Sequence, residues 1–387
     1  MTPAARMSAA IEVLDRVLAG APVEQVLTNW ARGARYAGST DRAELRDIVF
    51  DCLRSRASFA ALGGGLTGRG LVLGYARAMV DDPARDHFTG GPHAPVPPDP
   101  VTDAGRDPTA AEALNLPDWL QAPMQASLGD DFAPVMAAMA ARAPVFLRVN
   151  PGKTSRHGAI QALEAEGITT EVVPGAELAL QVQRGARRIK GSKAYAGGLI
   201  ELQDLASQQV IEALPLADGM RVLDYCAGGG GKTLAMAARA RLVLYAHDAA
   251  PRRMADLGPR ADRAGVRVTQ TAAPGSQAPY DLVLVDAPCS GSGSWRRDPE
   301  GKWLLTPERL QAVLLTQAGI LTLVAPMVRA GGWLAYVTCS MLDAENRDQI
   351  ARFQADHPGW VLERSLSLTP LTGGDGFFLA LLRRSDL

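Results

Sequence analysis

The sequence is poor in several features that define common classes of protein. Its four cysteines are spread over 387 residues without a CxxC pair, so neither a disulfide framework nor a zinc site is indicated. The five histidines are scattered too, and no metal site is expected. No run of eighteen apolar residues occurs, and the N-terminus lacks the core of a signal peptide. We therefore predict no membrane span and expect a cytoplasmic location.

Positive and negative charges are nearly balanced, so the net charge does not indicate which partners the protein binds. The net charge of −1 gives no general argument for nucleic-acid binding, so attraction to phosphate would depend on local patches. Only five of the 40 basic residues are lysines: Lys153, Lys190, Lys193, Lys232 and Lys302. In a chain that otherwise uses arginine, a retained lysine suggests a need for a compact ammonium group. Two of the five, Lys232 and Lys302, lie in the motifs described below.

The predicted elements divide the chain into four parts. Residues 1–62 are expected to be helical, because apolar residues recur at spacings of three and four. Residues 63–115 are dense in Gly, Pro and Asp, which predicts a flexible linker around one short helix near 71–80. Residues 116–204 begin with a helical stretch and continue as a small α/β region. Residues 205–387 alternate strands and helices, which predicts an α/β fold with a parallel, doubly wound sheet.

A glycine-rich loop, DYCAGGGGKT, joins the first strand of that alternation to a helix. Successive glycines permit a tight turn, and N–H groups at the start of a helix can hold a polar ligand. By itself the loop could serve a dinucleotide, a nucleoside triphosphate or S-adenosylmethionine. It departs from the P-loop pattern because Cys226 replaces the first glycine, and it lacks the GxGxxG spacing of hydride-transfer enzymes. Asp248 ends the next strand, where this fold places an acidic residue on ribose hydroxyls.

Two cysteines stand at the ends of neighbouring strands in the predicted sheet. Cys289, in DAPCSGSGSWRRDP, follows the fourth strand, and Cys339, in TCS, follows the fifth. A lone cysteine on an apolar strand is most often a small core residue. Both of these cysteines lie beside Pro, Gly or Ser at the edge where ligands bind, which favours a functional role. Thiolate is the reactive form of cysteine, so nearby positive charge would lower the pKa of such a thiol.

Together, DYCAGGGGKT, DAPCSGSGSWRRDPEGKW, TCSMLDAEN and DGFFLALLRR resemble the RsmB/Sun (NOP2-like) family of RNA 5-methylcytosine methyltransferases. GLIELQDLASQ (198–208) and LRVN (147–150) are similar to sequences upstream of the catalytic domain in that family. The resemblance implies a Rossmann-like class I methyltransferase domain with a small α/β RNA-binding extension, a monomer with S-adenosylmethionine as cofactor and RNA as partner. The start of the chain resembles a NusB-like helical domain that is reduced here, since the Gly/Pro-rich stretch replaces its later helices.

The resemblance also implies roles for individual residues. Cys339 would be the nucleophile, Cys289 would assist release of methylated RNA, and Asp286 would act on the cytosine ring with Lys232 nearby. The implied cofactor contacts are Cys226, Ala227, Gly228, Gly229, Gly230, Gly231, Lys232, Asp248, Arg253 and Asp286. The implied RNA contacts are Arg148 and Asn150, lining a groove, and Arg296, Arg297 and Lys302, approaching phosphates or orienting the loop.

The chemistry of cytosine explains why a cysteine would be needed. Carbon 5 is too weak a nucleophile to take a methyl group directly. A thiolate that adds to carbon 6 creates an enamine whose carbon 5 can attack the methyl sulfonium, so covalent catalysis divides one hard step into easier ones. A base must then remove the carbon 5 proton so that the thiol can leave.

The chain departs from the family pattern at the third strand, where VTQTAAP supplies Thr271 and Ala272 in place of an acidic adenine contact. Ribosomal RNA is the favoured substrate and transfer RNA a second candidate. Two other hypotheses are a DNA cytosine methyltransferase, which would make Cys289 the nucleophile, and a non-catalytic RNA-binding assembly factor. The first lacks its usual Glu-Asn-Val loop here. The second would have no need for Asp286, Cys289, Cys339 and Lys232 together.

Overall fold

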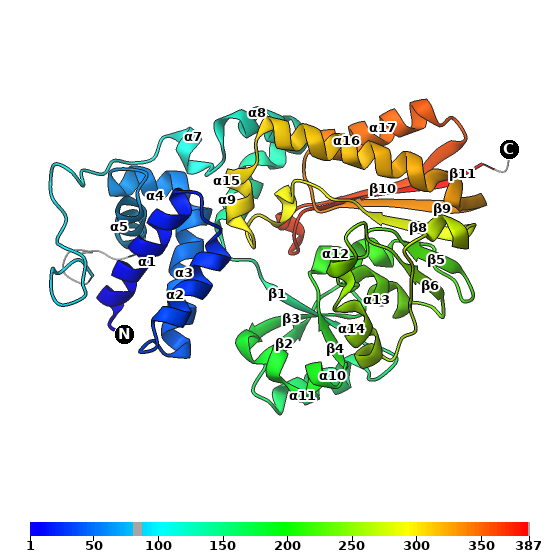
Figure 1. Cartoon of the computed structure of the whole chain (residues 1–387), viewed down its shortest axis with the longest axis horizontal. Coiled ribbons are helices and arrows are strands. Elements are labelled where there is room, and N and C mark those ends of the chain that lie inside the picture. The colour runs from blue at the N-terminus through cyan, green and yellow to red at the C-terminus, as the bar shows by residue number, and fades with distance from the viewer. Residues whose placement is uncertain (80–86, 386–387) are drawn as a thin grey trace. The chain divides into compact units, whose positions relative to one another are not determined.

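A computed structural model of the chain describes residues 1–79 and 87–385 and divides it into two units (Figure 1). The helical unit comprises Met1–Arg142 and Trp295–Leu304, and the α/β unit comprises Ala143–Ser294 and Leu305–Leu387. The chain therefore enters the helical unit a second time in the segment that follows Cys289. This second passage was not predicted.

The helical unit contains a bundle formed by the first five helices of the chain. Buried residues at helical spacing, such as Val13, Leu14, Leu45 and Val49, form its core. The helices of this unit are α1 (Pro3–Leu18), α2 (Val23–Gly33), α3 (Ser39–Arg54), α4 (Arg56–Gly63), α5 (Gly68–Met79), α7 (Ala110–Ala113), α8 (Asp118–Leu128), α9 (Phe132–Ala140) and α15 (Pro299–Leu304).

Glycines expected to make a flexible linker instead allow α4 and α5 to pack closely. A Cβ atom on Gly63 would lie 1.7 Å from the carbonyl oxygen of Gly70, and one on Gly74 would lie 2.0 Å from that of Phe59. Such distances are far inside van der Waals contact, so only glycine permits this approach. The helix predicted near 71–80 is thus confirmed as α5, apart from residue 80, which is outside the described residues.

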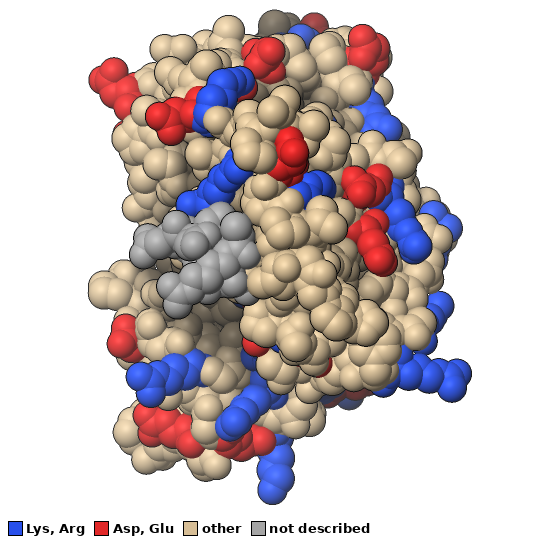
Figure 2. All heavy atoms as spheres, turned by 90° about the vertical axis from the view of Figure 1, so that its left-hand side faces the viewer, with Lys and Arg blue, Asp and Glu red and all other residues tan. Residues whose placement is uncertain are grey.

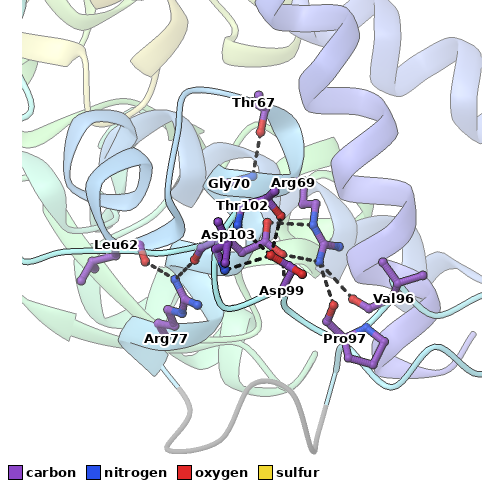
Figure 3. Close-up of polar contacts among 11 residues, drawn as sticks. Leu62, Thr67, Arg69, Gly70, Arg77, Val96, Pro97, Asp99, Thr102 and Asp103 are labelled. Carbon is purple, nitrogen blue, oxygen red and sulfur yellow. Dashed lines mark hydrogen bonds and ion pairs between the residues drawn. The ribbon is translucent and has the colours of Figure 1, made fainter.

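The described part of the Gly/Pro-rich stretch after α5 is tied to the bundle by arginines (Figure 3). Arg69 pairs with the buried Asp103 at 2.8 Å and donates to the carbonyl oxygens of Val96 and Pro97. Arg77 donates to the carbonyl oxygen of Asp103 at 3.0 Å. The prediction of a flexible linker is therefore wrong for this part, because charge-assisted hydrogen bonds hold it. Residues 80–86 of the predicted linker lie outside the described residues.

The α/β unit begins with a small antiparallel sheet of strand order β2-β3-β1-β4. Its strands are β1 (Val145–Val149), β2 (Thr169–Val172), β3 (Ala179–Arg184) and β4 (Ile200–Leu202), with helices α10 (Arg156–Glu164) and α11 (Lys193–Ala196). Leu147, Leu163 and Leu180 are fully buried between the sheet and α10. The α/β region predicted upstream of the catalytic domain is present with this topology.

A seven-stranded sheet of order β10-β11-β9-β8-β5-β6-β7 forms the rest of this unit. The strands are β5 (Arg221–Asp224), β6 (Val243–Ala246), β7 (Thr269–Gln270), β8 (Tyr280–Asp286), β9 (Val328–Thr338), β10 (Trp360–Leu368) and β11 (Phe377–Arg384). The strands β5 to β9 pair in parallel with one another, whereas β11 is antiparallel to β9 and β10. The doubly wound parallel sheet is confirmed. The antiparallel hairpin at its edge was not predicted.

Helices cover both faces of this sheet (Figure 1). They are α12 (Leu205–Glu212), α13 (Gly231–Ala237), α14 (Leu257–Ala264), α16 (Pro307–Val324) and α17 (Arg347–Asp356). Leu282 and Leu284 of β8 pack in the cluster that holds α12 and α13, and Val283 and Val285 pack in the cluster that holds α16 and α17. Successive side chains of a strand point to opposite faces of the sheet, so these four residues of β8 are all apolar because both faces are covered by helices.

One helix in this unit is long and apolar. Pro307–Met327, which contains α16, has a mean hydropathy of 1.6 and could cross a membrane by length and composition alone. In the structure, Leu321 and Val324 lie in the core against the sheet, and Gln317 is buried. The buried residues thus place one side of this helix against the sheet.

Candidate active site

The two predicted catalytic cysteines lie side by side at the carboxyl ends of β8 and β9. Cys289 Sγ and Cys339 Sγ are 3.3 Å apart, within hydrogen-bond distance for thiols. The loop that carries Cys289 is fixed to the end of β9, because Gly293 N donates to the Cys339 carbonyl oxygen at 2.9 Å. Parallel neighbouring strands bring the two loops to the same edge of the sheet, although 50 residues separate the cysteines in sequence.

The two thiols differ in their affinity for a proton. The hydrogen bond donated by Cys289 lowers the pKa of Cys339, and Lys232 and Ser294 add to this effect against the opposing influences of burial and of the Asp286 carboxylate. The same hydrogen bond, together with burial, raises the pKa of Cys289 well above its ordinary value. Cys339 is therefore the sulfur that more readily becomes the thiolate, and Cys289 the one that retains the proton. A thiolate is the form that attacks carbon.

An ion pair faces this pair of sulfurs. Lys232 Nζ, from the start of α13, lies 2.8 Å from Asp286 Oδ2 at the end of β8, and 5.0 Å from the centre of the Phe377 ring. Burial alone would lower the pKa of Lys232, but attraction to Asp286 outweighs it and raises the pKa. Lys232 is therefore a stable cation next to Cys339. The structure thus brings together all four residues predicted to be catalytic.

The glycine loop turns tightly between β5 and α13. Gly228 and Gly230 have positive φ angles of 50° and 79°, and a Cβ atom on Gly230 would lie 2.1 Å from Leu257 Cδ1. At the end of β5, Asp224 is fully buried and accepts a hydrogen bond of 2.6 Å from the Thr233 hydroxyl. Its other oxygen, Oδ1, has no hydrogen-bond partner among the described residues. Burial raises the pKa of Asp224 to about 7.

Asp248 anchors the next loop, at the end of β6. One of its oxygens accepts a hydrogen bond from Gly228 N at 3.0 Å, and the other accepts one from Ala250 N at 2.9 Å. Arg253 Nη1 lies 3.3 Å from the Asp248 carboxylate and is largely exposed. The predicted cofactor residues therefore lie at the carboxyl ends of the neighbouring strands β8, β5 and β6. Cys226 is half-buried there, and burial raises the pKa of its thiol to about 12, so that it remains protonated.

Contacts from the small sheet hold the glycine loop from outside. Arg260 of α14 donates to the Gly229 carbonyl oxygen at 2.5 Å and pairs with Glu201 of β4 at 2.7 Å. Gln203 donates to the Gly231 carbonyl oxygen at 3.2 Å. These residues were not predicted, because their link to the loop depends on the packing of two separate sheets. The signal that the sequence offered is Glu201 itself, an acidic residue within the apolar segment GLIEL that contains β4.

The residues predicted to contact RNA fall into two groups. Arg148, only 5% exposed, and Asn150 line a cavity of about 450 Å³ with Lys153, Arg239 and Arg241. Burial lowers the pKa of Arg148 to about 10, and its Nε atom has no hydrogen-bond partner among the described residues. Asn150 donates to the carbonyl oxygens of Gly198 and Ala264, so it organises the cavity wall.

The second group lies in the segment after Cys289, within the helical unit. Lys302 is 5% exposed and donates to the Arg54 carbonyl oxygen at 3.1 Å, at the C-terminus of α3. The carbonyl oxygen of Arg296, also buried, accepts a hydrogen bond from Arg54 Nε at 2.7 Å. The expectation that these two side chains approach phosphates is corrected, because both are inside the protein; they fit the alternative, that they orient the loop. Arg297 is exposed.

The sequence is similar to that of known methyltransferases. The sequence model described as 16S rRNA methyltransferase RsmB/F matches residues 211–383, and that of the RsmF/B-like ferredoxin-like domain matches residues 116–187. The chain is 34% identical over 300 residues to the ribosomal RNA small subunit methyltransferase B of Xylella fastidiosa, covering 72% of this chain and 69% of the relative. It is 32% identical over 305 residues to the probable methyltransferase B of Synechocystis, covering 71% and 68%. The chain belongs to the RsmB/F methyltransferase family.

A solved structure extends the likeness to the whole fold. The crystal structure of PH0851 matches with a TM-score of 0.78 and 23% identity, covering 99% of each chain. At that identity the match concerns the fold alone. The predicted Rossmann-like methyltransferase fold is confirmed by this match and by the strand order.

S-adenosylmethionine is the cofactor of RsmB/F methyltransferases, and residues at the ends of β5 and β6 fit it. Asp224 Oδ1, which has no hydrogen-bond partner within residues 1–79 and 87–385, can accept a hydrogen bond from an ammonium group, and Asp248 can accept one from ribose hydroxyls. The tight turn at Gly228 and Gly230 lets a ligand approach the backbone closely. At the third strand, where an acidic side chain is usual, the carbonyl oxygen of Thr271 lies 3.0 Å from His247 Nδ1, and the Thr271 hydroxyl accepts a hydrogen bond from Ala273 N at 3.2 Å.

Proposed function

We propose that this protein transfers a methyl group from S-adenosylmethionine to carbon 5 of a cytosine in RNA, through a covalent adduct with Cys339. The observation that carries the proposal is the separation of 3.3 Å between Cys289 Sγ and Cys339 Sγ beside the Lys232–Asp286 ion pair. A methyltransferase that acts on an oxygen or nitrogen atom needs a base or an oriented lone pair, but not two thiols. A thiolate is needed where the acceptor is a weakly nucleophilic ring carbon.

Each residue has a defined part in this reaction. The Cys339 thiolate attacks carbon 6 of the cytosine, and the Lys232–Asp286 pair passes a proton to N3 through Asp286 as electrons move toward that atom; the proton returns to the pair when the ring is restored. Bound S-adenosylmethionine supplies the electrophilic methyl group, which carbon 5 accepts. Cys289, after its own proton has passed to solvent, takes the proton from carbon 5. The bond between Cys339 and carbon 6 then breaks, which restores the thiolate and releases the methylated RNA.

Local charge, rather than bulk charge, supports an RNA substrate. On the face shown in Figure 2, Lys and Arg side chains are interspersed with Asp and Glu side chains, as the net charge of −1 would suggest. In the α/β unit, the cavity of about 450 Å³ beside the small sheet is bordered by four basic residues and two acidic ones, namely Arg148, Lys153, Arg239, Arg241, Glu201 and Asp218. We propose that this cavity receives RNA phosphates, and that ribosomal RNA is the substrate, as the names of the bacterial relatives suggest.

The experiment that tests this proposal is bisulfite sequencing of total RNA from a strain that lacks this protein. We expect one cytosine of ribosomal RNA to lose its methyl group and to regain it on complementation with the wild-type gene, but not with Cys339→Ala. Loss of methylation only in transfer RNA would mean that transfer RNA is the substrate and that the proposed chemistry still holds. Unchanged methylation of every RNA cytosine would contradict the proposal.

A scaffold with no activity is the rival that needs a direct test. RNA that contains 5-azacytidine should form a covalent adduct with the wild-type protein, because the modified ring cannot lose the enzyme after methyl transfer. A non-catalytic assembly factor would bind the same RNA without forming any covalent bond.

A further inference from the structure

A buried carboxylate that the proposed reaction does not use lies behind the two cysteines. Glu345, in the 3-10 helix η7 (Asp343–Glu345), is fully buried. It accepts hydrogen bonds from Ser290 N at 2.8 Å and Gln317 Nε2 at 3.1 Å, and from the hydroxyl groups of Ser290 and Ser340 at 2.5 Å each. A backbone N–H and an amide NH₂ can only donate, so the side chain of Glu345 acts as an acceptor throughout.

The two serines that Glu345 binds are the direct sequence neighbours of the two cysteines. Ser290 follows Cys289 and Ser340 follows Cys339. One carboxylate thus joins the loop after β8 to the loop after β9. Further bonds reinforce this junction, since Ser292 Oγ lies 3.0 Å from Ser340 Oγ and accepts a hydrogen bond from Met341 N at 2.8 Å.

Glu345 itself is held in place by groups on both sides. Its carbonyl oxygen accepts a hydrogen bond of 2.7 Å from the Tyr336 hydroxyl. Its neighbour Asn346 accepts from the Thr338 hydroxyl at 2.6 Å and donates to the Ser340 carbonyl oxygen at 2.9 Å. A carboxylate fixed in this way can set the distance between the loops that it joins, because the side chains of buried, satisfied networks do not reorient freely.

We propose that Glu345 is a positioning residue that sets the spacing of Cys289 and Cys339 and keeps the proton on Cys289. This inference rests on the proposed roles of the two cysteines. The charged and titratable groups around the sulfur pair are Cys289 and Cys339 themselves, Tyr336 on β9, Asp286 on β8, Lys232 on α13 and Glu345 in η7. Lys232 favours the thiolate of Cys339, whereas Glu345 disfavours a thiolate at Cys289.

The asymmetry between the thiols has a use in the proposed reaction. After the hydrogen bond that Cys289 donates to Cys339, burial, and the charge of the Cys339 thiolate, the negative charge of Glu345 is a further cause of the raised pKa of Cys289. A thiol of high pKa gives a strongly basic thiolate, which suits removal of the carbon 5 proton. Cys289 also cannot compete with Cys339 for carbon 6, because only a small fraction of Cys289 is thiolate when Cys339 attacks.

Two substitutions test separately the charge and the length of the Glu345 side chain. Glu345→Gln removes the charge and keeps the length of the side chain, whereas Glu345→Asp keeps the charge and shortens the reach. Asp343→Asn is a matched control, since it removes a carboxylate from the same turn, one that pairs with Arg347. Circular dichroism and thermal unfolding establish that each variant is folded.

The first measurement is the pH dependence of alkylation of Cys289 by iodoacetamide, resolved by peptide mass spectrometry in a Cys339→Ser background. With Glu345 present, the midpoint should be high; Glu345→Gln should move it to lower pH and raise the rate at neutral pH at least tenfold. Glu345→Asp and Asp343→Asn should leave the midpoint nearly unchanged. An unchanged midpoint in Glu345→Gln would overturn the part of the proposal that concerns the proton.

The second measurement is the rate at which diamide, a two-electron thiol oxidant, converts Cys289 and Cys339 to a disulfide. Each thiol gives up one hydrogen to diamide, so the rate reports how often the sulfurs meet. We expect a decrease of at least tenfold in Glu345→Asp and no decrease in Asp343→Asn. Equal rates in all proteins would overturn the positioning part. Neither assay requires RNA or methyl transfer, so failure of the proposed function and failure of this proposal are distinguishable.

Discussion

Lys232 Nζ lies 2.8 Å from Asp286 Oδ2, and both residues face the thiol of Cys339. Lys232 comes from the end of the cofactor loop and Asp286 from the end of the strand before Cys289. The ion pair therefore joins the region proposed to bind the cofactor to the region proposed to hold the base. Within the pair, Lys232 lowers the pKa of Cys339 and Asp286 opposes it.

Lys232→Met should shift the pH profile of methyl transfer to higher pH. Removing the ammonium leaves the Asp286 carboxylate unopposed, so the pKa of Cys339 rises. Below that pKa, the single-turnover rate follows the fraction of thiolate, and each unit of increase lowers it about tenfold. Single-turnover kinetics as a function of pH would measure the shift. Lys193→Met, at an exposed lysine outside the site, is the control, and an identical profile for both variants would refute the assigned role of Lys232.

Asp224→Asn should remove a component of the pH dependence of stability in the cofactor-free protein. Burial raises the pKa of Asp224 to about 7, above the value of about 3.9 for an unfolded Asp. Its contribution is thus present in full at low pH and is lost as pH rises through about 7. From about pH 5 to about pH 8 the loss amounts to about 3 kcal/mol.

Urea denaturation of the wild type and of Asp224→Asn at both ends of that pH range would test this estimate. The difference in unfolding free energy between the two proteins should change with pH by that amount. A difference that does not depend on pH would mean that Asp224 is ionised in the folded protein throughout.

Glu201→Gln should weaken binding of S-adenosylmethionine without preventing folding. Glu201 holds Arg260 on the Gly229 carbonyl oxygen, and charge-assisted hydrogen bonds of this kind contribute about 1.5–3 kcal/mol. Partial loss of that energy raises the Kd by about tenfold or more. Isothermal titration calorimetry would give the value, with Glu171→Gln on the exposed edge strand β2 as the control. Equal Kd values for wild type and Glu201→Gln would show that this contact does not shape the cofactor loop.

Much of the α/β unit could be predicted because its evidence is local. The strands β5, β6, β8 and β9 are short apolar runs followed by glycine, acidic residues or cysteine, and these signals need no knowledge of distant residues. The same is true of Cys289 and Cys339, since each ends such a run. The antiparallel strand β11 was missed as an element because an apolar segment does not reveal its direction.

Other features depend on contacts between distant segments and could not be predicted. The glycines around α4 and α5 suggested flexibility, whereas Gly63 and Gly74 permit close packing that only the three-dimensional structure reveals. Lys302, in the motif DAPCSGSGSWRRDPEGKW, was expected to approach RNA phosphates or to orient the loop, and it is buried against the end of α3. Glu345 lies 55 residues from Ser290, so the hydrogen bond between Glu345 and the Cys289 loop could not be predicted from the sequence.

The most direct test of the central claim is denaturing gel electrophoresis of Cys339→Ala and Cys289→Ala after incubation with the substrate RNA and S-adenosylmethionine. We expect Cys289→Ala to form a covalent adduct that contains methylated RNA, because transfer proceeds and release fails. Cys339→Ala should form neither adduct nor methylated RNA. Methyl transfer at the wild-type rate by Cys339→Ala, or an adduct with Cys339→Ala in place of Cys289→Ala, would contradict the account.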